Sequence, residues 1–139
     1  MKIVYCSSAI ILNTKKECLI ASRNNKTSLS NYFEFPGGKL EKNEGFEETL
    51  IRELKEELGI TIQKESLNHF LQITHKYSDF FLYMHIFLIE NIELQLRSFD
   101  NEKLVWVSKD NLLDVNILPA NKIIINERRF RKQNDSKRL

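Results

Sequence analysis

Three glutamates crowd one face of a predicted helix. The segment 45–58 is expected to be helical, because polar residues precede it and Gly59, a natural helix stop, follows it. Residues three and four positions apart share a helix face, so Glu53, Glu56 and Glu57 project together. Their mutual repulsion would be offset by a hard divalent cation such as Mg²⁺, which binds carboxylate oxygens. For the helix taken alone, a solvated acidic face neutralised by Lys and Arg is the simpler explanation.

A proline–glycine turn precedes this helix and favours the metal-site interpretation. Pro36, Gly37 and Gly38 end a short predicted strand, and glycine lets backbone carbonyls approach a ligand closely. The wider segment 41–57 holds seven acidic residues against three basic ones. Such a centre repels bare polyphosphate, so it is either a solvated face or a place where cations are held.

The spacing of these residues resembles a known family motif. The chain reads Gly38, five residues, Glu44, seven residues, Arg52-Glu53-Leu54, one residue, Glu56-Glu57, one residue, Gly59-Ile60. This pattern is similar to the complete Nudix box, the signature of the Nudix hydrolase superfamily, and it covers about a sixth of the chain. Two further segments, 34–41 and 118–121, resemble the MutT-like branch, which includes 8-oxo-dGTP diphosphatases.

The resemblance implies a role for each matching residue. In the family this segment binds divalent metal ions, Mg²⁺ with Mn²⁺ as a possible substitute, and helps to activate water. The implied metal ligands are a carbonyl of Gly37 or Gly38, and the side chains of Glu53, Glu56 and Glu57. Glu53 is either a ligand or the general base, and Arg52 orients it. Glu44 braces the loop before the helix or contacts a metal-bound water.

The implied reaction is hydrolysis of a nucleoside triphosphate to the monophosphate and pyrophosphate, as in enzymes that remove 8-oxo-dGTP. Metal ions neutralise the charge of the triphosphate and activate water, and a carboxylate accepts the water proton. CTP-like nucleotides, dinucleoside polyphosphates and capped RNA stay open as substrates, and so does a Nudix-fold binding module without turnover. ADP-ribose is disfavoured, because neither Pro36 nor Pro119 lies where that class carries a proline.

Five residues are expected at the substrate. Lys39 resembles a residue that contacts the phosphates. Asn121 lies where MutT-like enzymes read a purine edge, and its amide offers one acceptor and two donors. This favours a purine, whereas Asp would favour cytosine; otherwise Asn121 only occupies the first turn of a helix. Phe35 and Tyr77 either stack on the base or pack in the core, and Arg23 faces the nucleotide or solvent.

One metal ligand is left open by the sequence. Relatives often supply a further acidic ligand on a loop shortly before a Trp. In this chain Asp100 and Glu102 precede Trp106, but neither is in a clear register with that position.

The remaining pattern predicts an α+β fold. Runs of apolar and β-branched residues predict strands, and Pro119 suits the start of a second helix that ends near residue 131. The predicted strands are 3–12, 17–22, 32–35, 70–77, 80–89 and 104–107. The first two are expected to be neighbours across a turn at 13–16. Strands flanking two helices indicate a mixed sheet sandwiched between helices, and the resemblance implies the Nudix fold.

Composition favours one domain in a reducing compartment. The 139 residues are 42% hydrophobic and 29% charged, which predicts one domain over 1–133 and a frayed basic tail at 134–139. No apolar run reaches the ~20 residues of a membrane helix, and 1–13 reads as a strand rather than a signal peptide. Cys6 and Cys18 form no CxxC pair, which suggests a cytoplasmic protein.

The end of the chain is basic. From Lys122 onward seven basic residues accompany two acidic ones. We expect a solvated helix end rather than a nucleic-acid-binding arm, because aromatic residues are not interleaved with the bases. No protein partner is implied.

Overall fold

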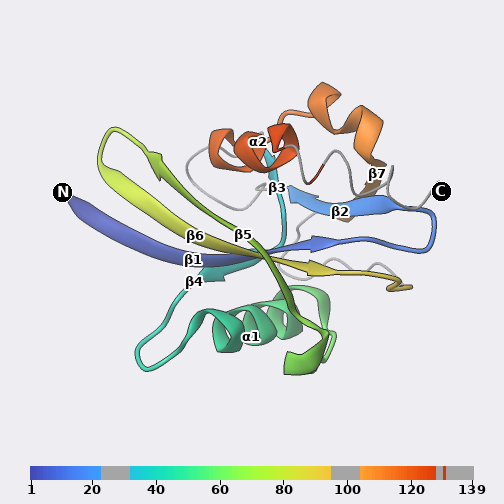
Figure 1. Cartoon of the computed structure of the whole chain (residues 1–139), viewed down its shortest axis with the longest axis horizontal. Coiled ribbons are helices and arrows are strands. Elements are labelled where there is room, and N and C mark those ends of the chain that lie inside the picture. Colours follow the sequence, from blue (N-terminus) through green and yellow to red (C-terminus); the bar gives the residue numbers. More distant parts are fainter. Residues whose placement is uncertain (23–31, 95–103, 128–129, 131–139) are drawn as a thin grey trace.

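Two β-sheets form the centre of the protein. The computed structural model describes residues 1–22, 32–94, 104–127 and 130. The larger sheet has the strand order β4-β1-β6-β5, and the smaller has the order β3-β2-β7 (Figure 1). Their bounds are β1 Lys2–Ile11, β4 Gly37–Lys39, β5 Asn68–Lys76, β6 Phe80–Ile89, β2 Glu17–Ser22, β3 Phe33–Glu34 and β7 Leu104–Ser108.

The larger sheet is mixed. β1 runs parallel to β6 from Lys2↔Phe80 to Ile11↔Ile89, while β4 and β5 pair antiparallel with their neighbours. Residues of β1 alternate between faces: Ala9 packs in one hydrophobic cluster and Ile10 in the other. The C-terminal half of β1, from Ser7 to Ile11, is therefore buried on both faces, and its last three residues are apolar, as such a position requires.

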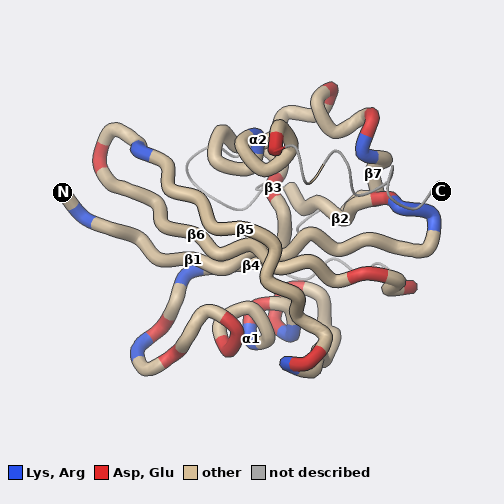
Figure 2. The backbone as a smooth tube through the Cα atoms, in the orientation of Figure 1, with Lys and Arg blue, Asp and Glu red and all other residues tan. Residues whose placement is uncertain are grey.

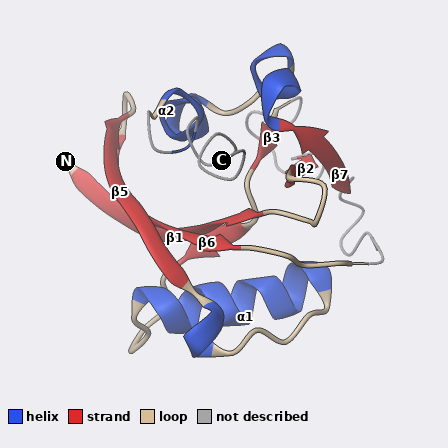
Figure 3. Cartoon of the chain, turned by 45° about the vertical axis from the view of Figure 1, so that its right-hand side comes forward, coloured by secondary structure: helices blue, strands red, loops and turns tan. Residues whose placement is uncertain are grey.

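Helices cover both faces of the larger sheet. α1 (Phe46–Leu58) lies on one face, and α2 (Pro119–Asn126) lies on the other together with the smaller sheet (Figures 1 and 3). Two short 3₁₀ helices, η1 (Lys64–Ser66) and η2 (Lys109–Asp114), precede β5 and follow β7. The chain thus has the predicted α+β architecture, with a mixed sheet between helical layers. Among the described residues, no helix is long and apolar enough to span a bilayer.

Three details of the sequence-based prediction are wrong. β1 and β2 meet at the predicted turn, where Leu12 and Cys18 form a bridge and the Asn13 N–H donates to the Glu17 carbonyl at 3.1 Å, but beyond the turn they belong to different sheets. The strand predicted at 32–35 contains only Phe33 and Glu34. α2 ends at Asn126, because Glu127 turns to an extended backbone with ψ 132°.

α1 is fixed at both ends. The backbone N–H of Gly45 donates to the Glu48 carboxylate at 2.9 Å, and Gly59 ends the helix in the left-handed conformation with φ 69°. Ser7 of β1 donates its hydroxyl to the Phe46 carbonyl at 2.5 Å, which holds the first turn against the sheet. Charged residues gather along α1 and the loop before it (Figure 2).

Candidate active site

The predicted turn of glycines is the strand β4, and it lies in contact with β1. Gly37 has φ +155°, and a Cβ there would lie 2.1 Å from the Ser7 carbonyl oxygen. A Cβ on Gly38 would lie 2.3 Å from the Glu53 carboxylate. Glycine therefore allows two close approaches: Gly37 lets β4 pack on the β1 backbone, and Gly38 leaves room for the Glu53 carboxylate.

Arg52 binds the acidic residues around it. Its Nε donates to Glu44 Oε2 at 2.6 Å, and its Nη2 donates to Glu44 Oε1 at 3.0 Å. Nη2 also donates to the Lys39 carbonyl at 3.1 Å. Nη1 lies 3.3 Å from both Glu53 Oε1 and Glu56 Oε2. This two-point pairing with Glu44 is the geometry in which a guanidinium binds a carboxylate most specifically.

The Arg52–Glu44 pair shifts both pKa values in the expected directions. The hydrogen bond from Arg52, followed by the one from the Glu41 backbone, lowers the pKa of Glu44 to about 2. The same bond raises the pKa of Arg52. Both groups therefore stay ionised throughout the neutral range, and Arg52 is held in one orientation.

The third carboxylate of the cluster lies against β4. Glu57 Oε1 accepts a hydrogen bond from the backbone N–H of Gly37 at 3.1 Å. All three carboxylates thus lie beside the glycine strand β4. Glu53 lies against Gly38, Glu57 is bonded to Gly37, and Glu56 is linked to the strand by Arg52, which also donates to the Lys39 carbonyl. Their oxygens are the donors that a hard divalent cation takes, so the residues present fit such an ion by chemistry. Within the described part of the chain, no three His, Cys, Asp or Glu side chains already converge into a metal cage.

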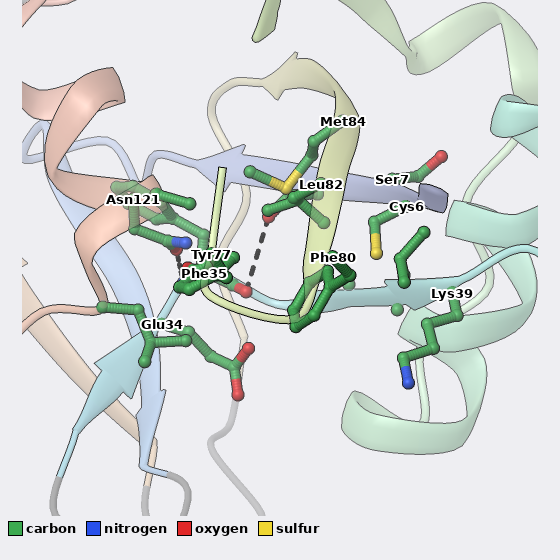
Figure 4. A pocket seen from close by; sticks show the side chains of 16 residues that line it. Cys6, Ser7, Glu34, Phe35, Lys39, Tyr77, Phe80, Leu82, Met84 and Asn121 are labelled. Carbon is green, nitrogen blue, oxygen red and sulfur yellow. Dashed lines mark hydrogen bonds between the residues drawn. The ribbon is translucent and has the colours of Figure 1, made fainter. Parts of the chain in front are cut away.

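A cavity of about 320 Å³ opens beside this cluster, between β1, β6 and α2 (Figure 4). Gly37, Gly38 and Lys39 line one end, and Phe35 and Asn121 line the other. The glycine strand therefore contributes to both the acidic cluster and the cavity.

Asn121 is buried and faces this cavity. Only 5% of it is exposed, and its Oδ1 accepts the Phe35 N–H at 2.7 Å. A backbone N–H can only donate, so this bond fixes which amide atom faces which way. The Nδ2 donors have no partner among the described residues. Leaving buried donors unpaired costs about 1–3 kcal/mol, so this group points to an acceptor supplied by a ligand.

The aromatic residues of the cavity divide into a core residue and an outer pair. Phe35 is only 2% exposed and packs edge-on against Phe130, with ring centroids 6.3 Å apart. It belongs to the core and lines the cavity floor. Tyr77 stacks on Phe80 across the β5–β6 turn, at 4.9 Å between centroids, and both line the cavity. These rings offer a flat surface for a base.

Phe80 and Cys6 line the cavity although the sequence reasoning did not select them. The aromatic residues on both sides of the Ser78-Asp79 turn were a usable signal for Phe80. No local signal marks Cys6, because only the register Cys6↔Lys39 between β1 and β4 places it there. Burial raises the pKa of Cys6 to about 11, while the charge of Lys39 opposes this shift.

Most of the predicted residues are placed by the structure in one region. Glu44, Arg52, Glu53, Glu56 and Glu57 surround the glycine strand, while Phe35, Lys39, Tyr77 and Asn121 line the adjoining cavity. Arg23 and the acids at 100 and 102 lie outside the described residues. The functional roles of all these residues stay predictions.

Comparison with known proteins gives a consistent result. Residues 8–127 match the NUDIX domain family. The chain is 33% identical over 125 residues to an 8-oxo-dGTP diphosphatase of Escherichia coli K12, covering 90% of this chain and 95% of that protein. It is 30% identical over 122 residues to a CTP pyrophosphohydrolase of the same organism, covering 86% and 87%.

Solved structures agree with this match. A MutT protein from Methanosarcina mazei superposes with a TM-score of 0.80 over 99% of this chain and 97% of that chain. At 22% identity, this likeness bears on the fold alone. A solved chain from a structural study of MutT from Aliivibrio salmonicida and Vibrio cholerae superposes with a TM-score of 0.73 at 26% identity, over 89% of this chain and 94% of that chain.

Proposed function

Because the chain belongs to the NUDIX domain family, we propose that it hydrolyses a nucleoside triphosphate to the monophosphate and pyrophosphate. The observation that carries this proposal is that an acidic cluster and a ligand-sized cavity lie side by side in one site. An Arg-bound acidic cluster lies beside Gly38, and a cavity with unpaired buried donors opens from the same strand. Nucleotides have a matching form, with a flat base bearing hydrogen-bonding groups at one end and anionic phosphates at the other.

The cofactor of the reaction is a divalent cation, and Mg²⁺ is the ion we propose, with Mn²⁺ as a substitute. Glu53, Glu56 and Glu57 would hold it, together with a carbonyl of Gly37 or Gly38. When bound, such an ion neutralises phosphate charge and makes water a better nucleophile. The support in this chain is the choice of donors, since carboxylate and carbonyl oxygens are what a hard cation takes.

The side chains divide the remaining work. Glu53 accepts a proton from the attacking water or binds the metal, and the contact with Arg52 Nη1 at 3.3 Å orients its carboxylate. Glu44 acts on Arg52 and not on the substrate, because its Oε2 accepts from the guanidinium and its Oε1 accepts from the guanidinium, the Thr49 hydroxyl and the Glu41 N–H. Lys39 lies at the phosphate end of the cavity and supplies positive charge there.

The base end favours a carbonyl-bearing edge. Because Asn121 Oδ1 is bound by the Phe35 N–H, the side chain presents only donors to a ligand. Donors pair with the O6 atom of guanine-type bases and oppose the exocyclic amine of cytosine or adenine. Of the two substrates named for the relatives above, this favours the 8-oxo-dGTP class over CTP.

Two wider expectations remain proposals. We infer that residues 1–133 act as one domain and that 134–139 form a basic tail. Residues 131–139 lie outside the part of the chain that the structure describes. We also infer that the protein works in the reducing cytoplasm, which the unpaired thiols of Cys6 and Cys18 support.

The deciding experiment is a nucleotide panel. Purified protein with Mg²⁺ is given 8-oxo-dGTP, dGTP, CTP and a dinucleoside tetraphosphate, and the products are separated as pyrophosphate or phosphate. We expect monophosphate and pyrophosphate, with the guanine-type substrates preferred. Reaction in ¹⁸O-labelled water locates the attacked phosphorus, since the label enters either the monophosphate or the pyrophosphate. Release of phosphate alone, or no turnover of any substrate, would overturn the proposal.

A further inference from the structure

The thiol of Cys6 lies on the wall of the cavity. Figure 4 shows it on β1 between the end with Asn121 and the end with Lys39, and nearer to Lys39. The charges of Lys39, Glu34 and Glu53 all act on this thiol. Cys6 therefore lies where the base end of the cavity meets the acidic cluster.

A second observation indicates that this cavity receives a ligand. The Nδ2 donors of Asn121 are buried, face the cavity and have no partner in the described part of the chain. A ligand that satisfies them and also reaches Lys39 must extend past Cys6. For a nucleotide, the part that passes this thiol is the sugar.

We propose that Cys6 is a modification site at which mixed-disulfide formation with a small disulfide closes the cavity to nucleotides. The proposal rests on the proposed function in one respect, that the ligand is a nucleotide. The added group occupies part of a cavity of only about 320 Å³. It therefore competes for space with the sugar, and removing it restores binding.

The modification is a thiol–disulfide exchange that needs no oxidant other than the small disulfide itself. The Cys6 thiol gives up its proton, and the thiolate attacks one sulfur of the disulfide. The Cys6–sulfur bond forms as the sulfur–sulfur bond of the reagent breaks, and the released thiolate takes up a proton. A free thiol reverses the same exchange. Because burial disfavours the thiolate of Cys6, we expect the exchange to be slow at neutral pH and faster as the pH rises.

The other cysteine is an internal control. Cys18 is 0% exposed in the middle of β2 and belongs to the hydrophobic core. Burial raises its pKa to about 12. The same reagent should therefore leave Cys18 unmodified in the folded protein.

The test uses the reduced full chain and bis(2-hydroxyethyl) disulfide. Peptide mass mapping identifies the modified thiol, and calorimetry measures the affinity for 8-oxo-dGMP before and after modification. We expect one adduct at Cys6, an affinity lowered at least tenfold, and recovery after dithiothreitol. Nucleotide at ten times its dissociation constant or more should slow the modification about tenfold or more. A Cys6→Ser chain should show no change in affinity on treatment, and a Cys18→Ser chain should respond like the unmutated chain.

The outcomes separate the two proposals. Failure to label Cys6, or labelling that leaves affinity unchanged, overturns the modification site whatever the hydrolysis assays show. A chain that binds nucleotide, loses binding on labelling and yet hydrolyses nothing keeps this proposal and overturns the proposed function. A chain that binds no nucleotide overturns both.

Discussion

The replacement Gly38→Ala separates catalysis from folding. Gly38 does not have a positive φ, so alanine fits the backbone without strain. Its Cβ would lie 2.3 Å from Glu53 Cδ and Oε2, and 2.7 Å from Oε1. The carboxylate is the flexible end of a side chain, so it yields while the strand stays in place. We therefore expect a folded protein in which one carboxylate is displaced.

The size of the effect follows from that distance. Restoring an ordinary contact moves the Glu53 carboxylate by about 1 Å, and misplacing a catalytic group by this much lowers the rate by about 10². Two factors of ten correspond to about 2.7 kcal/mol in the activation free energy. The free energy of unfolding should change by less than about 1 kcal/mol, because Gly→Ala also reduces the freedom of the unfolded chain.

Two neighbouring glycines provide matched controls. Gly37→Ala places a Cβ 2.1 Å from the Ser7 carbonyl and 2.8 Å from Ser8 Cα, both rigid backbone, at φ +155°. We expect it to destabilise the fold by about 3 kcal/mol or more. Gly45→Ala meets only the flexible Glu48 carboxylate, so activity should change by less than about threefold and stability by about 1 kcal/mol.

Steady-state hydrolysis of 8-oxo-dGTP gives kcat/KM for the three variants, and urea unfolding gives their stability. The reasoning is refuted if Gly38→Ala retains near-normal kcat/KM, since the displaced carboxylate would then have no role. It is also refuted if Gly38→Ala unfolds as readily as Gly37→Ala, because the contact at Gly38 would then be structural.

Three further predictions address other parts of the site. Glu57→Gln should lower kcat by ~10² or more with the fold intact. Glu47→Gln changes a glutamate on the same helix that pairs with Lys64 at 3.8 Å, and it should leave kcat unchanged. Equal activities of the two variants would remove Glu57 from the proposed metal site. Asn121→Asp replaces donors by an acceptor and should raise KM for 8-oxo-dGTP while lowering it for CTP; equal changes for both would contradict base reading by this residue. The pKa of Glu44 in the folded protein, about 2, lies below its ordinary 4.5. The ionised carboxylate therefore stabilises the fold fully above pH 4.5, and this stabilisation is lost as the pH falls toward 2. The urea midpoints of Glu44→Gln and the unmutated chain should converge over that range, and a constant difference would refute the pairing.

The parts of the site that were predictable from the sequence are local in the chain. The shared face of Glu53, Glu56 and Glu57 follows from helical spacing, and Gly59 ends the helix as expected. Spacing also brought Arg52 into the motif, and its contact with Glu56 is the ordinary pairing of residues four apart. These relations involve a single turn of helix, so one sequence suffices to predict them.

The parts that were missed depend on contacts between distant segments. Asn121 and Phe35 are 86 positions apart, and only the packing of α2 near β3 brings the amide oxygen to the backbone N–H. The sequence argument counted that oxygen as available to a base. Cys6 enters the cavity through strand register, and Phe80 through the β5–β6 turn. The division of the strands into two sheets was missed for the same reason: it depends on which distant strands pair, and the periodicity within one strand does not encode its pairing partner.

This division between local and distant contacts has a functional consequence. The acidic cluster depends on residues 37–57, and its contacts with Arg52 and the glycine strand do not involve the base end of the cavity. Asn121, Tyr77 and Phe80 lie on α2 and at the β5–β6 turn. Substitutions there can change which base is bound while the Arg52–Glu44 pair stays intact. A family can thus keep one reaction and vary its substrate, and the two E. coli relatives, which carry different substrate names, fit that arrangement.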